Sequence, residues 1–270
     1  MTSAGRFAPS PSGELHVGNL RTAILAWLFA RSTGRQFLMR VEDLDRARAG
    51  AEAEQLRDLA AIGVTWDGDV VRQTDRGPLY ADAIARLAAA GLTYECFCTR
   101  REIQEAPSAP HAPQGAYPGT CRDLSAAERE AKRAVRPAAV RLRSAVTEAA
   151  VQDVLHGSYT GVVDDFVLRR NDGVTAYNLA VVVDDAAQGI DQVVRGDDLL
   201  PSTPRQSYLA SLLNIPVPEY AHVPLVLNAD GARLAKRDGA VTLTDLAAVG
   251  VPVDEVRDAL LASLGLPAGP

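Results

Sequence analysis

Long apolar runs, lysine and cysteine are all scarce in this sequence of 270 residues. No stretch approaches the ~20 consecutive apolar residues of a membrane-spanning helix, so we expect no membrane partner. Residues 1–8 also lack the basic and apolar regions of a secretory signal. These absences predict a protein of the cytoplasm.

Positive charge does not dominate either, since 28 basic residues face 34 acidic ones and the net charge is −6 at pH 7. A protein coated in positive charge is therefore excluded, and any contact with nucleic acid must be a local patch. The candidate patches are Arg100 with Arg101, residues 132–143, and Arg169 with Arg170. Each of them could instead be a solvated face.

Lysine is almost absent, because only Lys132 and Lys236 occur among the basic residues. Because this chain uses arginine at nearly every other basic position, the lysine at position 236 indicates that an ammonium is needed there. A compact ammonium can follow moving phosphate oxygens, whereas a planar guanidinium prefers a fixed bidentate partner. Glycines on both sides of Lys236 predict a mobile loop. The alternative is that Arg233, Lys236 and Arg237 form a solvated charge cluster.

The three cysteines, Cys96, Cys98 and Cys121, cannot all pair with one another. A cytosolic chain would also keep them reduced, so disulfides explain them poorly. A structural zinc site is favoured by two thiols separated by one residue and by a third that follows a Pro/Gly-rich segment. Neighbouring arginines would lower the pKa values of these thiols. Its fourth ligand stays open at this point, with His111 as the usual chemical choice. The alternative is that the cysteines act as small buried hydrophobes.

The segment from Arg6 to Asn19 is predicted to be a strand, a Pro/Gly-rich loop and a helix start. Apolar residues then follow at helical spacing up to a stop at Gly34. His16 and Gly18 therefore fall in or beside the first helical turn, where backbone N–H groups and the helix dipole attract anions such as phosphate. The alternative is a proline-braced loop with a hydrogen-bonded histidine.

The remaining pattern predicts an interrupted α/β protein. Buried strands are expected at 4–8, 37–42 and 64–66, with helices at 20–33, 46–62 and 79–90, as βαβ units with a Rossmann-like parallel sheet require.

From about residue 92 the pattern changes, which predicts an inserted domain. It would contain the cysteines, Pro-rich residues 107–118 and a helix at 125–135, and a hairpin of 165–170 with 176–179 would lead back to the sheet. The predicted divisions are 1–92 and 171–240 for the two halves of the catalytic domain, 93–170 for the zinc-containing insertion, and 241–270 for a short helical C-terminal segment.

Several stretches together resemble the glutamyl branch of the class I aminoacyl-tRNA synthetases. Residues 6–18 follow the family pattern R-F-A-P-S-P-T-G-x-L-H-x-G, and Arg21-Thr22-Ala23 completes it. The resemblance recurs in order at Arg40–Asp45, Val194–Leu199, Ser202–Gln206, His222–Val226 and Arg233–Arg237.

This resemblance implies ATP with Mg²⁺ as cofactors. His16, Gly18 and Lys236 would be catalytic, and ATP would be bound by Pro9, His16, Gly18, Asn19, Arg233, Leu234, Ala235, Lys236 and Arg237. The family's loop reads K-L-S-K, whereas Arg233 and Ala235 here replace its first lysine and its serine. We expect the serine's contact to be lost.

The resemblance also implies a glutamate pocket, lined by Arg6, Phe7, Ala8, Pro9, Ser10, Glu42, Tyr177 and Arg195. Glu42 would meet the ammonium, Arg6 and Arg195 the carboxylates, and Tyr177 and Ser10 would be hydroxyl partners. The alternatives are a helix N-terminal charge for Glu42 and a surface ion pair with Asp197 or Asp198 for Arg195.

For the metal, the family pattern C-x-C with Y-x-x-x-C implies one structural Zn²⁺ held by Cys96, Cys98, Tyr117 and Cys121. Tyr117 is thus favoured over His111. Because the phenol pKa is ordinarily near ~10, the metal would have to promote its ionisation.

In full-length glutamyl synthetases an anticodon-binding region follows the lysine loop, but here only a short helical pattern at 243–265 follows it. The chain thus resembles a short paralogue that activates L-glutamate to glutamyl-adenylate and attaches it to queuosine in the anticodon of tRNA(Asp). We expect it to act as a monomer. One alternative is a truncated glutamyl-tRNA synthetase that charges tRNA ends, and another is a catalytically weak binding or regulatory paralogue.

Overall fold

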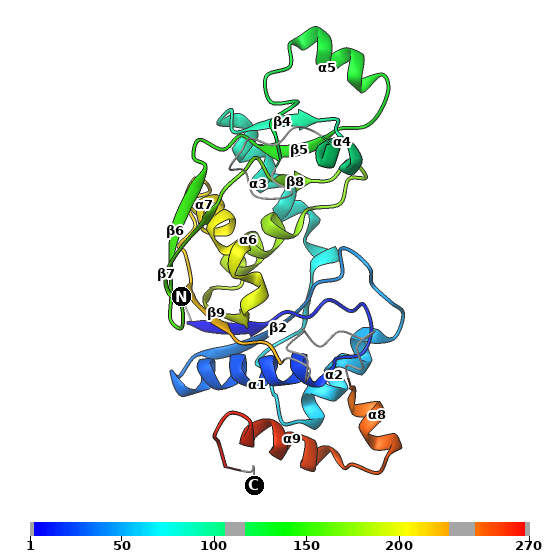
Figure 1. Ribbon diagram of the computed structural model, residues 1–270, viewed down its shortest axis with the longest axis vertical. Coiled ribbons are helices and arrows are strands. Elements are labelled where there is room, and N and C mark those ends of the chain that lie inside the picture. The colour runs from blue at the N-terminus through cyan, green and yellow to red at the C-terminus, as the bar shows by residue number, and fades with distance from the viewer. Residues whose placement is uncertain (1–2, 106–116, 227–240, 268–270) are drawn as a thin grey trace.

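The structure is a computed structural model that describes residues 3–105, 117–226 and 241–267 (Figure 1). Its N-terminal unit is strand β1 (Ala4–Phe7), helix α1 (Val17–Ser32) and strand β2 (Gln36–Val41). His16 caps α1 reciprocally with Asn19: the Asn19 N–H donates to His16 Nδ1 (3.3 Å), and the His16 N–H donates to Asn19 Oδ1 (3.2 Å). The expected strand, loop and helix start is confirmed, although the helix begins three residues earlier than predicted.

A seven-stranded sheet forms the centre of the molecule, in the order β3-β2-β1-β9-β10-β6-β7. All neighbours are parallel except β6 and β7. The remaining five strands are β3 (Val71–Arg72), β6 (Glu148–Asp153), β7 (Gly157–Val162), β9 (Ile190–Gly196) and β10 (Glu219–Val223). The chain leaves β1 for β2 on one side and returns as β9 on the other. Such a switch point leaves a crevice at the carboxyl ends of the strands.

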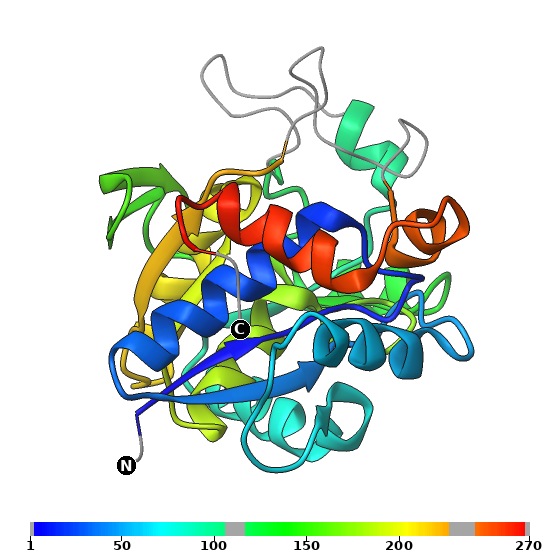
Figure 2. The same cartoon turned by 90° about the horizontal axis from the view of Figure 1, so that it is seen from below.

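Helices cover both faces of this sheet. On one face α1 packs with α2 (Ala51–Ala61) and with two C-terminal helices, α8 (Leu243–Ala248) and α9 (Val253–Ala262); Figure 2 shows α9 crossing over α1. The other face carries α3 (Gly77–Ala89), α6 (Tyr177–Ala187) and α7 (Thr203–Leu212), which share a second apolar core. Short 3₁₀ helices occupy Gln73–Arg76 and Asp197–Ser202. The predicted α/β class with a mainly parallel sheet and a helical C-terminus is confirmed.

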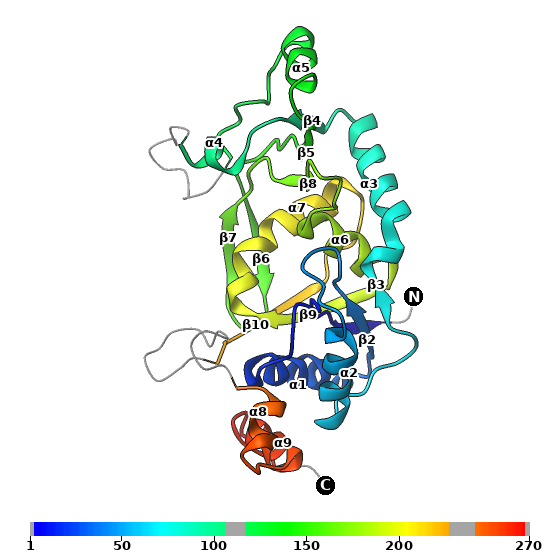
Figure 3. The same cartoon turned by 90° about the vertical axis from the view of Figure 1, so that its right-hand side faces the viewer.

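A smaller antiparallel sheet lies at the far end of the molecule from α8 and α9 (Figure 3). Its strands are β4 (Thr93–Cys96), β5 (Ala139–Leu142) and β8 (Val167–Arg169), accompanied by α4 (Arg100–Glu105) and α5 (Ala126–Arg133). The β6–β7 hairpin also comes from residues 93–170, yet it extends the large sheet. The residues predicted to form an insertion therefore do not lie wholly apart from the large sheet.

Three predicted elements are wrong in the structure. Residues 64–66 form no strand, because Val64 packs into the core below α1 and the ladder partner of β2 is β3 instead. The helix predicted at 46–62 begins only at Ala51, after Gly50 at φ +83°. The strand predicted at 176–179 is the first turn of α6, and only an isolated Arg169–Thr175 bridge remains of the hairpin. Residues 179–185 of α6 are all buried, so their apolar run carries no helical periodicity.

Among the described residues, no helix is both long enough and apolar enough to span a bilayer.

Candidate functional site

A cleft of about 970 Å³ opens at the carboxyl ends of β1 and β9. All eight predicted glutamate-site residues line it, together with His16 and Asn19 from the start of α1. Gly18 lies just inside the helix, where a Cβ would come within 3.0 Å of the His16 ring. The structure thus brings together the described part of the predicted site. Lys236 and its neighbours Arg233, Leu234, Ala235 and Arg237 lie outside the described residues.

The cap on α1 defines the hydrogen position on His16. Because the Asn19 N–H donates to Nδ1, that nitrogen is the acceptor, and in a neutral ring the hydrogen lies on Nε2. The ring therefore presents an N–H donor in the cleft, next to the positive end of the helix dipole.

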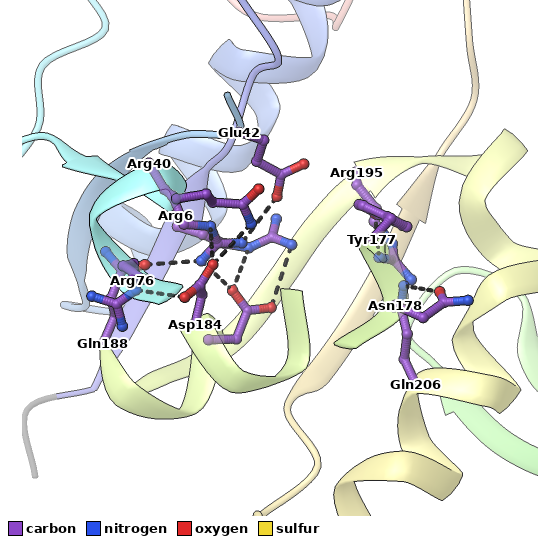
Figure 4. A network of polar contacts seen from close by, with 12 residues as sticks. Arg6, Arg40, Glu42, Arg76, Tyr177, Asn178, Asp184, Gln188, Arg195 and Gln206 are labelled. Atoms are coloured by element: carbon purple, nitrogen blue, oxygen red, sulfur yellow. Dashed lines mark hydrogen bonds and ion pairs between the residues drawn. The ribbon is translucent and has the colours of Figure 1, made fainter. Parts of the chain in front are cut away.

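Glu42 is held by a network of buried charges beneath the cleft (Figure 4). Arg40 is fully buried and donates from Nη2 to Glu42 Oε1 (3.2 Å) and from Nη1 to Asp185 Oδ1 (2.7 Å). Arg6 donates from Nε to the same Asp185 oxygen (3.2 Å). Burial raises the pKa of Glu42, and the charges of Arg40 and Arg6 oppose that rise.

Asp184 anchors the other side of this network. It accepts hydrogen bonds from Gln73 Nε2 (2.8 Å) and the Tyr80 hydroxyl (2.8 Å), and it pairs with Arg76. Three arginines thus meet three carboxylates: Arg6, Arg40 and Arg76 with Glu42, Asp184 and Asp185.

Sequence reasoning missed Arg40, Asp184 and Asp185. Two signals could have found them. Arg40 alternates with Met39 and Val41 along β2, so it points away from the core below α1 and toward α6. The two aspartates end an apolar run on α6, where buried acids need cationic partners.

Arg195 is the cation of the opposite wall of the cleft. Its side chain is buried, with 5% of the residue exposed, and it donates from Nε to His222 Nε2 (3.0 Å), from Nη2 to Thr203 Oγ1 (2.9 Å) and from Nη1 to the Tyr177 hydroxyl (3.3 Å). In the part of the chain that the structure describes, Arg195 has no ion pair. The alternative of a surface ion pair with Asp197 or Asp198 is therefore wrong.

A second cleft of about 750 Å³ adjoins the first and shares Ser10, Glu42 and Tyr177 with it. It extends to the cysteines beside the small sheet, and four arginines line it: Arg100, Arg136, Arg141 and Arg170. Two of the four are neutralised locally, since Arg136 pairs with Glu102 and Arg170 with Asp45. These arginines come from the three patches that the sequence indicated.

The three cysteines form a cluster that could hold a metal ion, since their sulfurs lie within 4.8 Å of one another. The Tyr117 hydroxyl lies 3.3 Å from Cys96 Sγ and 3.6 Å from Cys98 Sγ. Burial alone would raise the pKa of the Cys96 thiol, but its hydrogen bond with Tyr117 and the charge of Arg141 bring that pKa below its usual value. The predicted fourth ligand Tyr117 thus joins the cluster, whereas His111 lies outside the described residues.

Comparisons with known proteins agree with this geometry. Residues 4–266 match the model for the catalytic domain of class I tRNA synthetases (E and Q). The chain therefore belongs to the class I tRNA synthetases of the glutamyl and glutaminyl kind, a family of ligases.

Among its curated relatives, the chain is similar to two proteins named glutamyl-Q tRNA(Asp) synthetase. It is 69% identical to that of Nocardia farcinica over 268 residues, which are 99% of this chain and 86% of the relative. It is 54% identical to that of Cutibacterium acnes over 270 residues, which are 98% of this chain and 77% of the relative. The resemblance to a short paralogue is thereby confirmed.

A solved glutamate tRNA ligase from Elizabethkingia meningosepticum, in complex with its amino acid, is similar in structure, with a TM-score of 0.76 and 30% identity. The match covers 88% of this chain and 52% of the ligase, so the chain spans about half the length of that protein.

Proposed function

We propose that this chain activates L-glutamate with ATP and attaches it to a tRNA. The observation that carries the proposal is Arg195, a buried guanidinium that lines the cleft and has no ion pair among the described residues. A buried charge without a counter-ion is costly, and an anionic ligand would remove that cost. Glu42 lies opposite and offers a negative charge to an ammonium (Figure 4). Glutamate carries both charges that this pair would recognise.

In the proposed reaction, an oxygen of the glutamate α-carboxylate attacks the α-phosphorus of ATP. The bond from that phosphorus to the bridging oxygen breaks, which leaves glutamyl-adenylate and releases pyrophosphate. The Nε2–H of His16 and the start of α1 would face the phosphates, and Lys236 would add a positive charge. Mg²⁺ bound with ATP would neutralise charge on the leaving group. Positioning and electrostatics would supply the catalysis, so no covalent nucleophile is required.

We further propose that the acceptor is queuosine in the anticodon of tRNA(Asp). The support is the similarity to relatives named glutamyl-Q tRNA(Asp) synthetase and the arginine-lined cleft that continues from the glutamate site. Guanidinium groups there could hold the RNA backbone while a splayed base enters the cleft. A hydroxyl of the modified base would then attack the glutamyl carbonyl, and AMP would leave.

The acceptor can be tested with labelled glutamate and tRNA(Asp). Label is expected on tRNA(Asp) that carries queuosine and still expected when its terminal adenosine has been removed. The same tRNA without queuosine, and tRNA(Glu), should take up none. Loss of label with the terminal adenosine would identify a synthetase of tRNA ends.

Activation is tested separately by pyrophosphate exchange. With Mg²⁺, ATP and the protein, labelled pyrophosphate should enter ATP only when glutamate is present. If no glutamate-dependent exchange occurs with or without tRNA, the chain would instead be a binding or regulatory paralogue.

We also propose that the cysteine cluster holds one structural zinc ion through Cys96, Cys98, Tyr117 and Cys121. Tetrahedral zinc with bonds of about 2.3 Å places its sulfur ligands about 3.8 Å apart. The separation of 3.5 Å between the sulfurs of Cys98 and Cys121 is near that value. Zinc would tie β4 to the loop before α5 and so stiffen the small sheet.

Elemental analysis of the purified protein should find one zinc per chain. Cys121→Ser should lose most of it, because one of four ligands is replaced by a weaker donor. Tyr117→Phe should release zinc to a chelator faster than the wild type, with His111→Ala as the matched control. Full zinc in Cys121→Ser would contradict this site, and loss in His111→Ala alone would reassign the fourth ligand.

A further inference from the structure

Behind Arg195 lies a buried pair of residues that the proposed reaction does not use. His222 on β10 is directly opposite Arg195 on β9 in the parallel ladder. Its Nδ1 lies 2.6 Å from Asp153 Oδ2, and both side chains are fully buried. The chain of contacts therefore runs from Asp153 on β6 through His222 to Arg195, across three adjacent strands.

The hydrogen bonds define which nitrogen of His222 carries the hydrogen. The Nε of Arg195 can only donate, so His222 Nε2, at 3.0 Å, must be the acceptor. The ring hydrogen is then on Nδ1 and is donated to Asp153. Burial and the charge of Arg195 lower the pKa of His222 although Asp153 opposes them, which agrees with a neutral ring.

Asp153 is itself fixed in place by the backbone. Its Oδ1 accepts the N–H groups of Leu155 (2.9 Å) and His156 (3.0 Å), and its Oδ2 accepts the N–H of His222 (3.1 Å). A carboxylate with these contacts cannot rotate without breaking several hydrogen bonds. It therefore gives the His222 ring a single orientation.

We propose that Asp153 and His222 are positioning residues that fix Arg195 for recognition of a carboxylate. The lone pair of His222 Nε2 holds Arg195 Nε, while Thr203 and Tyr177 each take one N–H of the two Nη atoms. Of the five guanidinium N–H groups, one on each Nη then remains for a ligand. This inference rests on the proposed function, in which Arg195 binds glutamate.

The histidine also keeps the carboxylate of Asp153 from pairing directly with Arg195. A direct ion pair would compensate the guanidinium and weaken its preference for an anionic ligand. With neutral His222, Thr203 and Tyr177 around it, the charge of Arg195 stays available to the substrate. The arrangement thus favours glutamate over the uncharged glutamine.

Two substitutions of His222 separate its two hydrogen bonds. The amide of asparagine lies where Nδ1 of His222 lies, so it can still donate to Asp153 but offers no acceptor to Arg195. The longer glutamine can place its amide oxygen near the position of Nε2 and so accept from Arg195. In pyrophosphate exchange, His222→Asn is expected to raise the glutamate KM by about 10- to 100-fold and leave the ATP KM unchanged. His222→Gln should recover most of the loss. A purely structural role would change both KM values, or neither, in both variants.

A double-mutant cycle shows whether His222 acts through Arg195. In the Arg195→Ala background, His222→Asn should cause no further change in the glutamate KM. If Arg195→Ala itself has no effect, the proposed glutamate site fails. If Arg195→Ala raises the KM and His222→Asn does not, only the positioning role fails.

The wild-type protein supplies a test that needs no variant. With ¹⁵N-labelled histidine, the nitrogen shifts of His222 should report the neutral ring with hydrogen on Nδ1 at pH 7. A ring with hydrogen on Nε2, or on both nitrogens, would overturn the proposal even if His222→Asn fails to fold.

Discussion

Replacing Asp185 with alanine is expected to destabilise the fold by about 3–5 kcal/mol, the usual cost of removing one partner from a buried ion pair. Asp185 accepts hydrogen bonds from both Arg6 and Arg40, and Arg40 has no exposed surface. Alanine would leave the buried Arg6 and Arg40 and the half-buried Arg76 with two carboxylates. The free energy of unfolding in urea measures the effect, with exposed Asp172→Ala as the control. A loss below about 1 kcal/mol, the range of surface pairs, would contradict it.

The contacts of Asp185 with Arg6 and Arg40 also predict that the stability of the fold depends on pH. Burial would raise the pKa of Asp185, but Arg6 and Arg40 hold that pKa below its usual value. A carboxyl whose pKa is lower in the folded state contributes stability above its unfolded pKa of about 3.9 and loses it as pH falls through the folded value. The stability difference between wild type and Asp185→Asn should therefore be constant near pH 7 and shrink below about pH 4.

Replacing Arg195 with alanine is expected to lower kcat/KM for glutamate by about 30- to 1000-fold, equivalent to about 2–4 kcal/mol of lost transition-state stabilisation. The reason is the loss of a buried cation that has no ion pair among the described residues, so discrimination against glutamine should narrow in the same variant. Arg195→Lys keeps the charge but loses the planar fork of the guanidinium. Its kcat/KM for glutamate should therefore lie between those of the wild type and of Arg195→Ala.

Pyrophosphate exchange with glutamate and with glutamine measures both effects. Arg133→Ala is the matched control, because Arg133 lies on α5 and its side chain is half exposed. Unchanged discrimination in Arg195→Ala would place the recognition of the side-chain carboxylate elsewhere.

Local signals were enough to predict that His16 lies at the start of a helix and that the three cysteines lie together. The cap at His16 depends on residues three positions apart, and the cysteine cluster depends on spacings within 26 residues of sequence. The resemblance to the family also predicted that Glu42 and Arg195 line one pocket, and both line the same cleft in the structure. These features follow from short segments whose geometry is set by their own turns and caps.

The support beneath the site could not be predicted in this way. Asp153 and His222 meet only because β6 lies next to β10, an adjacency that no periodicity encodes. Tyr177 was predicted to lie in a strand because residues 179–185, which follow it in α6, are all buried and so lack the polar face of an amphipathic helix. Asp184 ends an apolar run that indicates burial, but its arginine partners are known only once the sheet order is known.

The scarcity of lysine acquires a physical reason in the buried network. Arg40 reaches three carboxylates, Glu42, Asp184 and Asp185, from a rigid planar fork with five N–H donors, whereas an ammonium offers three donors on a flexible stem. Lys132, by contrast, lies on the exposed helix α5. Arginine is thus favoured where a buried cation must hold several fixed partners at once.

The order of strands in the large sheet has a consequence for how the chain folds. β1 pairs with β2 through a short connection, but its other neighbour β9 is synthesised much later, with Ala4 opposite Ile190. Until α6 and β9 emerge from the ribosome, Arg6 and Arg40 have no Asp185 to meet and must stay hydrated. Closing so long a loop slows folding. The cleft that we propose binds glutamate is therefore completed late in folding, and a ligand bound there can stabilise only a chain whose second half has already docked.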